Sequence, residues 1–410
     1  MSLMTALSGL LAAQDGISVT GNDLANATTA GFKSGSSIFS DLYPASSANV
    51  PGDGVTEQEI QQDFSQGTLE TTDDPYNLAV EGNGFFVVQK NGQDYYTRDG
   101  AFQLSSGGQL ETASGNAVLG YGTNANGTSN GILSPITIPT TSQAANATST
   151  VSLSAALNSA DSAITTAFNA GSSATYDEST SVVAYDSLGN ANHVQLYFVQ
   201  NAASGSGSAT KPGTWTVYAQ PENANGSAVG SAKDLTTLAF TSSGALESGS
   251  SAALKVNWGN GAASSNIAFN FAGTTLGAQT FAVDGLTNNG YAPGQYTTAT
   301  ISDTGEVQAE YSNGQKVTVG NVALATFIND QGLVPLSQNL YAESDTSGQA
   351  VVNTPGAGTS GTLVAGSLEQ SNVETSNDLV QLLNYQEAYQ ANTSVLQGDW
   401  QDTQKLLQLS

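Results

Sequence analysis

The feature that most constrains this chain is an apolar stripe at each of its ends. In the N-terminal stripe the steps alternate between four and three residues, and its members are Leu3, Leu7, Leu10, Gln14, Ile17, Gly21, Leu24 and Thr28. Such steps place residues on one face of an α-helix. Gly9, Gly16 and Gly21 each weaken a helix by about 1 kcal/mol relative to alanine. We therefore expect this helix to become ordered only when it packs against partners.

The C-terminal stripe repeats this pattern over a longer stretch. Its members are Leu379, Leu382, Gln386, Tyr389, Thr393, Leu396, Trp400, Thr403 and Leu407. A helix from Thr375 to Leu407 would be about 50 Å long, and Ser376, Asn377 and Asp378 offer capping side chains near its start. Two helices that pair only with each other leave much of each stripe uncovered. We expect paired coiled-coil helices that pack with other copies of the chain; a simple internal hairpin is the alternative.

The long middle of the chain is typical of β-structure. Phe85–Gln89 and Tyr95–Arg98 flank Asn91-Gly92, a dipeptide that favours a two-residue β-hairpin turn. A second strand-rich block runs from Tyr296 to Ile328. Further strands, at 181–185, 193–200, 215–219 and 267–271, lie between these two blocks. The predicted fold is mainly β with α-helical termini, in which one β domain is inserted into another.

The order of these blocks predicts four parts. They are an inner helical assembly domain (1–30 and 372–410), connecting segments (31–72 and 356–371), a β-rich domain made of two discontinuous segments (73–145 and 286–355) and an inserted outer β domain (146–285).

The charge balance and the composition exclude several classes of protein. Eight basic residues face 34 acidic ones, for a net charge of −26, so neither nucleic-acid phosphates nor an anionic membrane is an expected partner. The chain has no cysteine, which excludes disulfides and thiolate sites. Met1–Ala13 is mostly apolar, but the first basic residue is Lys33, so we expect no cleaved signal peptide. The chain has no run of 18 apolar residues, so we expect no membrane-spanning helix.

The sequence offers no catalytic, cofactor-binding or metal-binding site. The single histidine, His193, lies in an alternating strand, which is typical of a surface or packing residue. No G-x-S-x-G elbow or Walker A sequence is present, and a metal site of His or Cys clusters cannot be built. A glycosidase that uses two carboxylates stays open as an enzymatic alternative, because the fold could bring two acids together.

Two stretches resemble the signatures of the bacterial flagellar rod and hook (axial) protein family. Gly21–Lys33 resembles the N-terminal signature, through Asn22, Asn26, Gly31, Phe32 and Lys33. Gly366–Val373 and the stretch that follows resemble the C-terminal signature, through Leu368, Glu369, Ser371, Asn372, Gln386, Tyr389 and Asn392. The strand pair around Tyr185–Val199 is similar to the start of the outer domain of the family's hook subunits, a domain that the shorter rod subunits lack.

This resemblance implies a structural subunit of the curved, hollow, flexible hook that passes torque from motor to filament. Implied partners are identical copies, the distal rod protein, the hook cap protein, the hook–filament junction protein and the flagellar export apparatus. The implied location is the flagellum, outside the cell, after export through its channel. The alternatives are a distal rod protein and a secreted carbohydrate-active β protein.

Two positions depart from the family pattern. Asp23 stands where an asparagine is usual, and Glu387 stands where an arginine is common. Glu387 reverses a charge within the terminal helices, which puts in doubt any salt bridge that the family's arginine makes. Some relatives cross-link through cysteine and lysine, which this chain cannot do because it lacks cysteine.

Overall fold

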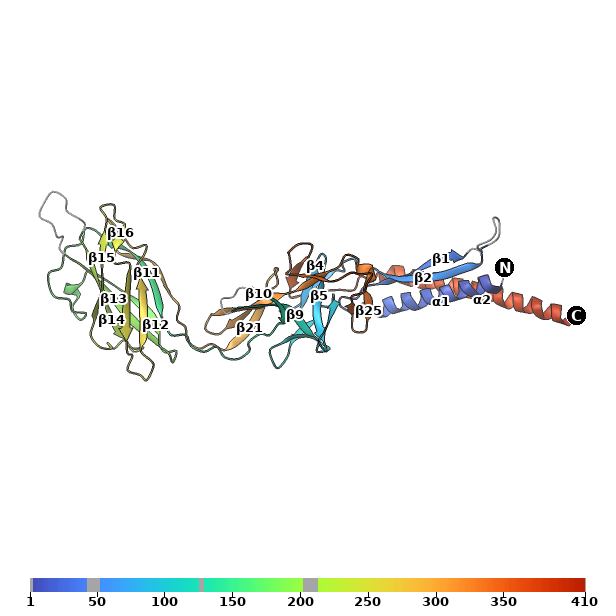
Figure 1. Ribbon diagram of the computed structural model, residues 1–410, viewed down its shortest axis with the longest axis horizontal. Coiled ribbons are helices and arrows are strands. Elements are labelled where there is room, and N and C mark those ends of the chain that lie inside the picture. Colours follow the sequence, from blue (N-terminus) through green and yellow to red (C-terminus); the bar gives the residue numbers. More distant parts are fainter. Residues whose placement is uncertain (1–2, 43–51, 125–128, 202–212, 410) are drawn as a thin grey trace. The chain divides into compact units, whose positions relative to one another are not determined.

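The computed structural model describes residues 3–42, 52–124, 129–201 and 213–409, without the side chains of residues 406, 407 and 409. These residues form two compact units, which we describe separately. Unit 1 comprises Met1–Thr140, Thr297–Glu310 and Lys316–Ser410, and unit 2 comprises Thr141–Tyr296 and Tyr311–Gln315. The predicted fold class, mainly β with helical termini, is confirmed (Figure 1).

The helical part of unit 1 brings the two ends of the chain together. Helix α1 (Leu3–Ala25) lies along helix α2 (Thr375–Leu409), and the two run antiparallel (Figure 1). Because α2 begins at Thr375, Ser376, Asn377 and Asp378 lie inside its first turn and not before it. A two-stranded sheet of β1 (Gly35–Leu42) and β2 (Gly54–Gln62) also lies along α1. The sequence reading had placed both strands within a connecting segment.

The β part of unit 1 is built on one large sheet. Its main path runs β21-β22-β23-β9-β5-β6-β26-β25. In that order the strands are Tyr296–Ile301, Glu306–Tyr311, Lys316–Val322, Ala117–Thr123, Phe85–Lys90, Gln93–Thr97, Leu340–Ala342 and Val334–Leu336. Strands off this path are β7 (Phe102–Leu104), β8 (Leu110–Thr112), β10 (Ser129–Pro135), β24 (Leu324–Thr326) and β27 (Val351–Asn353). The 3₁₀ turn η2 (Asp330–Gly332) precedes β25.

Two short strand pairs connect this sheet to the helices. Strand β4 (Leu78–Glu81) pairs with β28 (Thr362–Ala365), and β3 (Leu69–Thr71) pairs with β29 (Ser367–Glu369). Both pairs join a segment that follows α1 to a segment that precedes α2. The chain therefore enters and leaves the helical part side by side.

The predicted β5–β6 hairpin is present. Asn91 and Gly92 both adopt positive φ angles, 53° and 81°, as a type I′ turn requires. The strands carry apolar side chains into a core that includes Phe85, Val87 and Tyr96. Aromatic edge-to-face contacts strengthen that core, as between Phe85 and Tyr341.

Unit 2 is a sandwich of two sheets. One sheet is antiparallel and contains β12 (Glu178–Tyr185), β13 (Ala191–Gln200), β14 (Trp215–Glu222), β15 (Lys233–Phe240) and β16 (Leu246–Ser248). The other contains β17 (Ser251–Val256), β18 (Ser265–Asn270), β11 (Thr150–Asn158), β19 (Thr275–Gly277) and β20 (Ala282–Asn288). The 3₁₀ turn η1 (Ser173–Thr175) lies between β11 and β12. Both sheets contribute to one core, as Leu153, Phe198, Trp215 and Phe269 show.

Candidate assembly site

The register of the terminal helices follows from two glycines of α1. A Cβ built on Gly9 would lie 2.8 Å from the Asn392 side chain, and one built on Gly16 would lie 2.6 Å from the Tyr385 ring. Seven residues forward along α1 thus correspond to seven residues back along α2, which is the heptad step of an antiparallel pair. These glycines are contact points for α2, a role that helix propensity alone does not assign to them.

The face of α1 that meets α2 consists of small residues. Gly9 and Gly16 contact α2, and they belong to a row in steps of three and four with the buried residues Ala6, Ala13, Thr20 and Asp23. This seam lies one position before the leucine stripe, since Leu7, Leu10 and Leu24 each follow a seam residue. Small side chains let the two backbones approach closely and leave room for the larger side chains of α2.

The leucine stripe is consequently turned away from the seam. Leu3 and Leu7 are exposed, Leu7 with 40% of its surface accessible, while Leu10, Ile17 and Leu24 are half-buried. Met4 and Leu11 add to this open apolar face. The sequence reading did not single out these last two, although both lie one residue from a stripe position.

None of the α2 side chains that the structure describes is fully buried. Leu382 and Leu396 are half-buried, whereas Leu379, Tyr389 and Trp400 are exposed, Trp400 with 66% accessible. Val380 and Leu383 are exposed apolar residues that the sequence reading missed. The Leu407 side chain lies outside the described residues. Both helices therefore present apolar surface that the described residues of the chain do not cover.

The β1–β2 pair is fastened to α1 at two points. The backbone N–H of Val55 donates to the Ser8 hydroxyl at 3.2 Å, and the N–H of Gly35 donates to the Asp23 carboxylate at 3.0 Å. Asp23 is almost fully buried. Burial raises its pKa to about 6, against the lowering effect of the Gly35 hydrogen bond, and the nearby Asp378 raises it further.

The two family signatures meet in a buried ionic cluster at the base of the helices. The Lys33 ammonium lies 2.6 Å from Glu369 Oε1, and Arg98 Nη1 lies 3.2 Å from Glu369 Oε2. The side chains of Lys33 and Glu369 are fully inaccessible and that of Arg98 is 5% accessible. Burial lowers the pKa of Lys33, although the Glu369 charge acts to raise it.

Backbone groups complete the surroundings of this cluster. Lys33 also donates to the Ser65 carbonyl at 2.6 Å, and the Gly67 N–H donates to Glu369 Oε1 at 2.9 Å. The Gly31 N–H donates to the Glu369 carbonyl at 2.7 Å. A buried charge is tolerated only when it is paired and hydrogen-bonded, so these contacts are what allow the cluster to exist.

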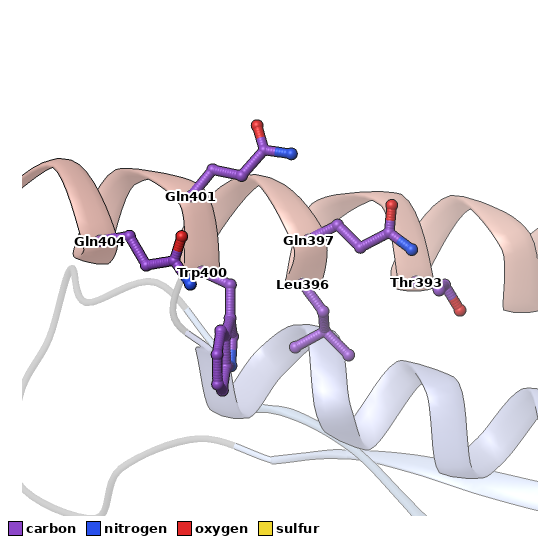
Figure 2. Close-up of a pocket in the computed structure, with 6 residues that line it drawn as sticks. All are labelled: Thr393, Leu396, Gln397, Trp400, Gln401 and Gln404. Carbon is purple, nitrogen blue, oxygen red and sulfur yellow. The ribbon is translucent and has the colours of Figure 1, made fainter.

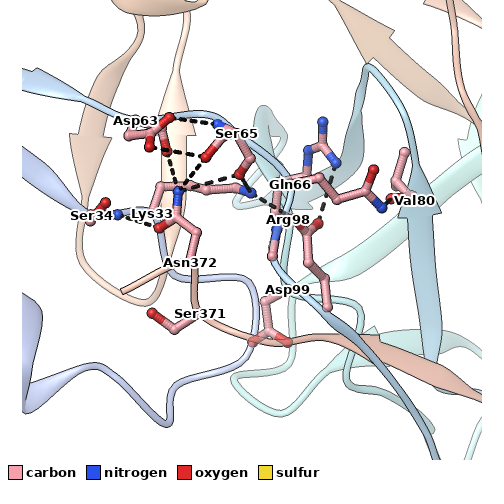
Figure 3. Close-up of polar contacts among 12 residues, drawn as sticks. Lys33, Ser34, Asp63, Ser65, Gln66, Val80, Arg98, Asp99, Ser371 and Asn372 are labelled. Carbon is pink, nitrogen blue, oxygen red and sulfur yellow. Dashed lines mark hydrogen bonds and ion pairs between the residues drawn. The ribbon is translucent and has the colours of Figure 1, made fainter. Parts of the chain in front are cut away.

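Asn372 links the start of the C-terminal segment to residues beside the ionic cluster. It accepts a hydrogen bond from the Ser34 N–H at 2.8 Å and donates to the Asp63 carbonyl at 2.7 Å. Figure 3 shows Lys33 and Asn372 reaching toward Ser65. The structure thus brings together Gly31, Lys33, Glu369 and Asn372 of the two signatures.

Arg98 is the member of the cluster that the sequence reading missed. It donates to the Gly82 carbonyl at 2.8 Å, and its guanidinium lies over the Phe85 ring, 5.3 Å from the centroid. The sequence could have indicated Arg98, because it is one of only eight basic residues in the chain and it lies between a strand and Asp99-Gly100.

The other signature residues lie elsewhere. Asn22, Asn26 and Phe32 line a pocket of about 620 Å³ that is also lined by Leu336 and Tyr341. Leu368 is half-buried on β29, and the Ser371 hydroxyl accepts a hydrogen bond from the Val373 N–H at 3.3 Å. Gln386, Tyr389 and Asn392 are spread along α2, and Glu387 is exposed there.

Features that would support other chemistry are limited. Across the described ranges, no group of three or more His, Cys, Asp or Glu residues is placed to hold a metal ion. No helix among the described residues is long and apolar enough to cross a membrane. His193 is half-buried on β13.

Three family models match parts of the chain. The model described as "Flagellar hook protein FlgE/F/G D1 domain" matches residues 79–155, and "Flagellar basal body protein FlaE D2 domain" matches residues 152–291. "Flagellar basal body rod FlgEFG protein C-terminal" matches residues 364–409, which include the second signature and α2.

Curated proteins and a solved structure are similar over long stretches. The chain is 35% identical over its full length to the flagellar hook protein FlgE of Salmonella typhimurium and to that of Escherichia coli, and it covers 100% of each. The crystal structure of Helicobacter pylori flagellar hook protein FlgE2 is similar in fold, with a TM-score of 0.57 and 15% identity. It covers 73% of this chain and the chain covers 100% of it.

Proposed function

The chain belongs to the flagellar hook protein family and is a structural subunit of the bacterial flagellar hook, and we propose that its paired terminal helices polymerise it into the tube of that hook. The observation that carries this proposal is the apolar surface left open on both helices, such as Leu7 on α1 and Trp400 on α2. Residues of this kind are covered when helices pack in a bundle.

The buried ionic cluster gives the helices a fixed base. Lys33 follows α1, Glu369 precedes α2, and Arg98 belongs to the β part of unit 1. Their contacts hold both helices to the same β scaffold. We propose that this joint sets the angle at which the helices enter the tube, while the β domains stack outside it. The proposal keeps the four parts predicted from the sequence, with the helices in the tube and the β domains outside it.

The wider role of the tube is inferred from the family resemblance. The proposal takes the hook as a curved, hollow and flexible joint that passes torque from motor to filament. In this proposal the subunit remains monomeric until it reaches the growing end, where neighbouring copies cover the apolar surface of its terminal helices.

The proposed partners come from the family resemblance, and they fit a polymer that has two unlike ends. Subunits joined by heterologous contacts leave one kind of surface free at one end and the complementary kind at the other. We assign the distal rod protein to one end, and the hook cap and hook–filament junction proteins to the other. Export through the flagellar channel without a cleaved signal belongs to this proposal. The lack of cysteine supports it, since no disulfide has to form or break on the way.

A non-enzymatic role completes the proposal. The family is structural, and the residues that the resemblance singles out serve contacts between segments. No described observation favours the distal rod protein or the carbohydrate-active alternative.

The test is to place a charge on the open face of α1. Leu7→Asp should abolish tube formation when the concentrated protein is salted out, because a carboxylate cannot be buried there without a partner. Leu188→Asp is the matched control, since Leu188 is an exposed leucine that lies outside the terminal helices. Electron microscopy reads the tubes and circular dichroism checks that the β units remain folded. Normal tubes from Leu7→Asp would refute the proposal, and straight rigid tubes from the natural chain would favour the rod alternative.

A further inference from the structure

We propose that neighbouring subunits join through two unlike surfaces of α2, with the Val380–Leu383 ridge of one copy packed into the Trp400 groove of the next. The inference rests on the proposed function, because it names the contact by which the terminal helices would polymerise. It differs from a general statement that the helices assemble, since it fixes which residues meet and how far one copy is displaced from its neighbour.

The Trp400 groove lies near the C-terminal end of α2. It has a volume of about 360 Å³ and is lined by Thr393, Leu396, Gln397, Trp400, Gln401 and Gln404. Figure 2 shows Leu396 and Trp400 pointing to the side where α1 lies, with Gln401 pointing away. The lining residues form two rows with steps of four, 393/397/401 and 396/400/404. The groove is therefore the channel between two adjacent side-chain ridges of one helix.

The ridge lies near the other end of α2. Val380 and Leu383 are three residues apart and are 58% and 56% accessible. Leu379, 49% accessible, widens the same patch. A ridge with steps of three fits a groove with steps of four when two helices cross at about +20°. That near-parallel crossing is the one expected when the α2 helices of successive copies run alongside each other in a bundle.

The register of the helix pair explains why the ridge and not α1 is the partner for the groove. Gly9 faces Asn392, so Met4 and Leu7 of α1 lie level with the groove at the same end of the pair. Leu379, Val380 and Leu383 lie at the opposite end, close to the base of the helices. Each pair thus carries one open apolar surface at each end. Joining like ends would give a closed dimer, whereas joining unlike ends gives an open polymer.

The contact also predicts a displacement. The ridge and the middle of the groove are separated by about 17 residues of one helix, which is roughly 25 Å at 1.5 Å per residue. Successive copies that place the ridge in the groove must therefore be shifted by roughly this distance along α2.

The chain's lack of cysteine allows a direct test by disulfide cross-linking. Two single variants, Val380→Cys and Gln397→Cys, are mixed, polymerised by salting out and oxidised. A disulfide needs Cα atoms within about 7 Å, and each variant carries one thiol, so a 380–397 bond can form only between copies. We expect this mixed dimer as the main cross-linked product, identified by peptide mass spectrometry.

The matched control replaces Gln397→Cys by Gln390→Cys. Gln390 is equally an exposed glutamine of α2 but lies outside the groove. The 380–397 product should exceed the 380–390 product at least tenfold. Tubes in which 380–390 or 380–380 dimers equal or exceed the 380–397 dimer would overturn the inference and leave the proposed function standing. If the natural chain forms no tubes, the proposed function fails, and the inference fails with it.

A second measurement avoids introduced thiols. Leu383→Ala should raise the protein concentration needed for tube formation at least tenfold, whereas Gln390→Ala should leave it unchanged within a factor of two. Equal effects of the two substitutions would contradict the assignment of the ridge. Circular dichroism of each variant before salting out confirms that the helix content is retained.

Discussion

Replacing Glu369 by glutamine should destabilise unit 1 by about 3–5 kcal/mol, the cost of removing one partner from a buried ion pair. Glu369 is the sole carboxylate within contact distance of the fully buried Lys33 ammonium, among the residues that the structure describes, and it also contacts Arg98. Glu369→Gln keeps the shape of the side chain but leaves two buried cations facing a neutral amide. The destabilisation therefore measures the charge and not a change of packing.

The assay is urea unfolding followed by two signals. Trp215 and Trp258 lie in the core of unit 2, so fluorescence reports mainly that unit, while circular dichroism also follows unit 1 and its helices. With a slope of about 1–3 kcal/mol per molar urea, the unit 1 transition should move down by at least about 1 M. The fluorescence transition should stay where it is.

The control is Glu310→Gln. Glu310 pairs with Lys316 on the surface, where the Lys316 side chain is 59% accessible, and such pairs contribute about 0–1 kcal/mol. Equal losses for Glu369→Gln and Glu310→Gln would refute the reasoning, because burial would then add nothing.

The pH dependence of the variant gives a further check. The pKa of Lys33 is already lowered by burial, and removal of Glu369 should lower it further. The folded variant then binds fewer protons than the unfolded chain, so its stability should rise with pH up to the ordinary lysine pKa of 10.5. The total rise should be larger than in the natural protein, because it scales with the difference between the folded and unfolded pKa values of Lys33.

Three further predictions concern single positions. Gly21→Ala should stabilise the helices by about 1 kcal/mol, because nothing lies within 4 Å of its added Cβ. Gly16→Ala should not stabilise them, because its Cβ would lie 2.6 Å from the Tyr385 ring. Thermal melting followed by circular dichroism compares the two variants. Burial raises the pKa of Asp23 to about 6, so stability should fall as pH rises from about 4 through 6, and Asp23→Asn should flatten this part of the stability profile. Burial alone would raise the pKa of Asp186, but hydrogen bonds to its carboxylate lower it to about 2. Asp186→Ala should therefore destabilise unit 2 by about 2 kcal/mol. Urea unfolding followed by fluorescence measures this loss.

The helix pair shows what periodicity can and cannot provide. Steps of three and four correctly predict helices at both ends. They cannot decide which of two adjacent stripes faces the partner, because both have the same period. Leucines favour the outer stripe by size, yet Gly9 and Gly16 let α2 approach more closely than Leu10 or Ile17 would. The contact between backbones, and not the largest side chains, sets the seam within the chain.

The β1–β2 pair was missed for a related reason. Strand β2 reads Gly-Val-Thr-Glu-Gln-Glu-Ile-Gln-Gln and most of its side chains are exposed, so it lacks the alternation that marks a half-buried strand. Its stability comes from the pairing with β1 and from contacts with α1, such as the hydrogen bond at Ser8. Neither is visible in the local sequence.

The ionic cluster could be found only in part. Lys33 and Glu369 each stand within a signature, but they are 336 residues apart, and no local pattern relates two such positions. Arg98 stands in a turn sequence, where a surface role is the ordinary expectation. The fold brings the three together because β3 pairs with β29 and carries Glu369 beside the segment that follows α1.

The central claim is that the outer face of the helix pair is open in the subunit and covered in the tube. The most direct measurement is the rate at which maleimide reacts with Leu7→Cys, the single thiol of an otherwise cysteine-free chain, before and after polymerisation. The account predicts a reaction at least tenfold slower in tubes than in dispersed subunits. Equal rates in tubes and in dispersed subunits would contradict it.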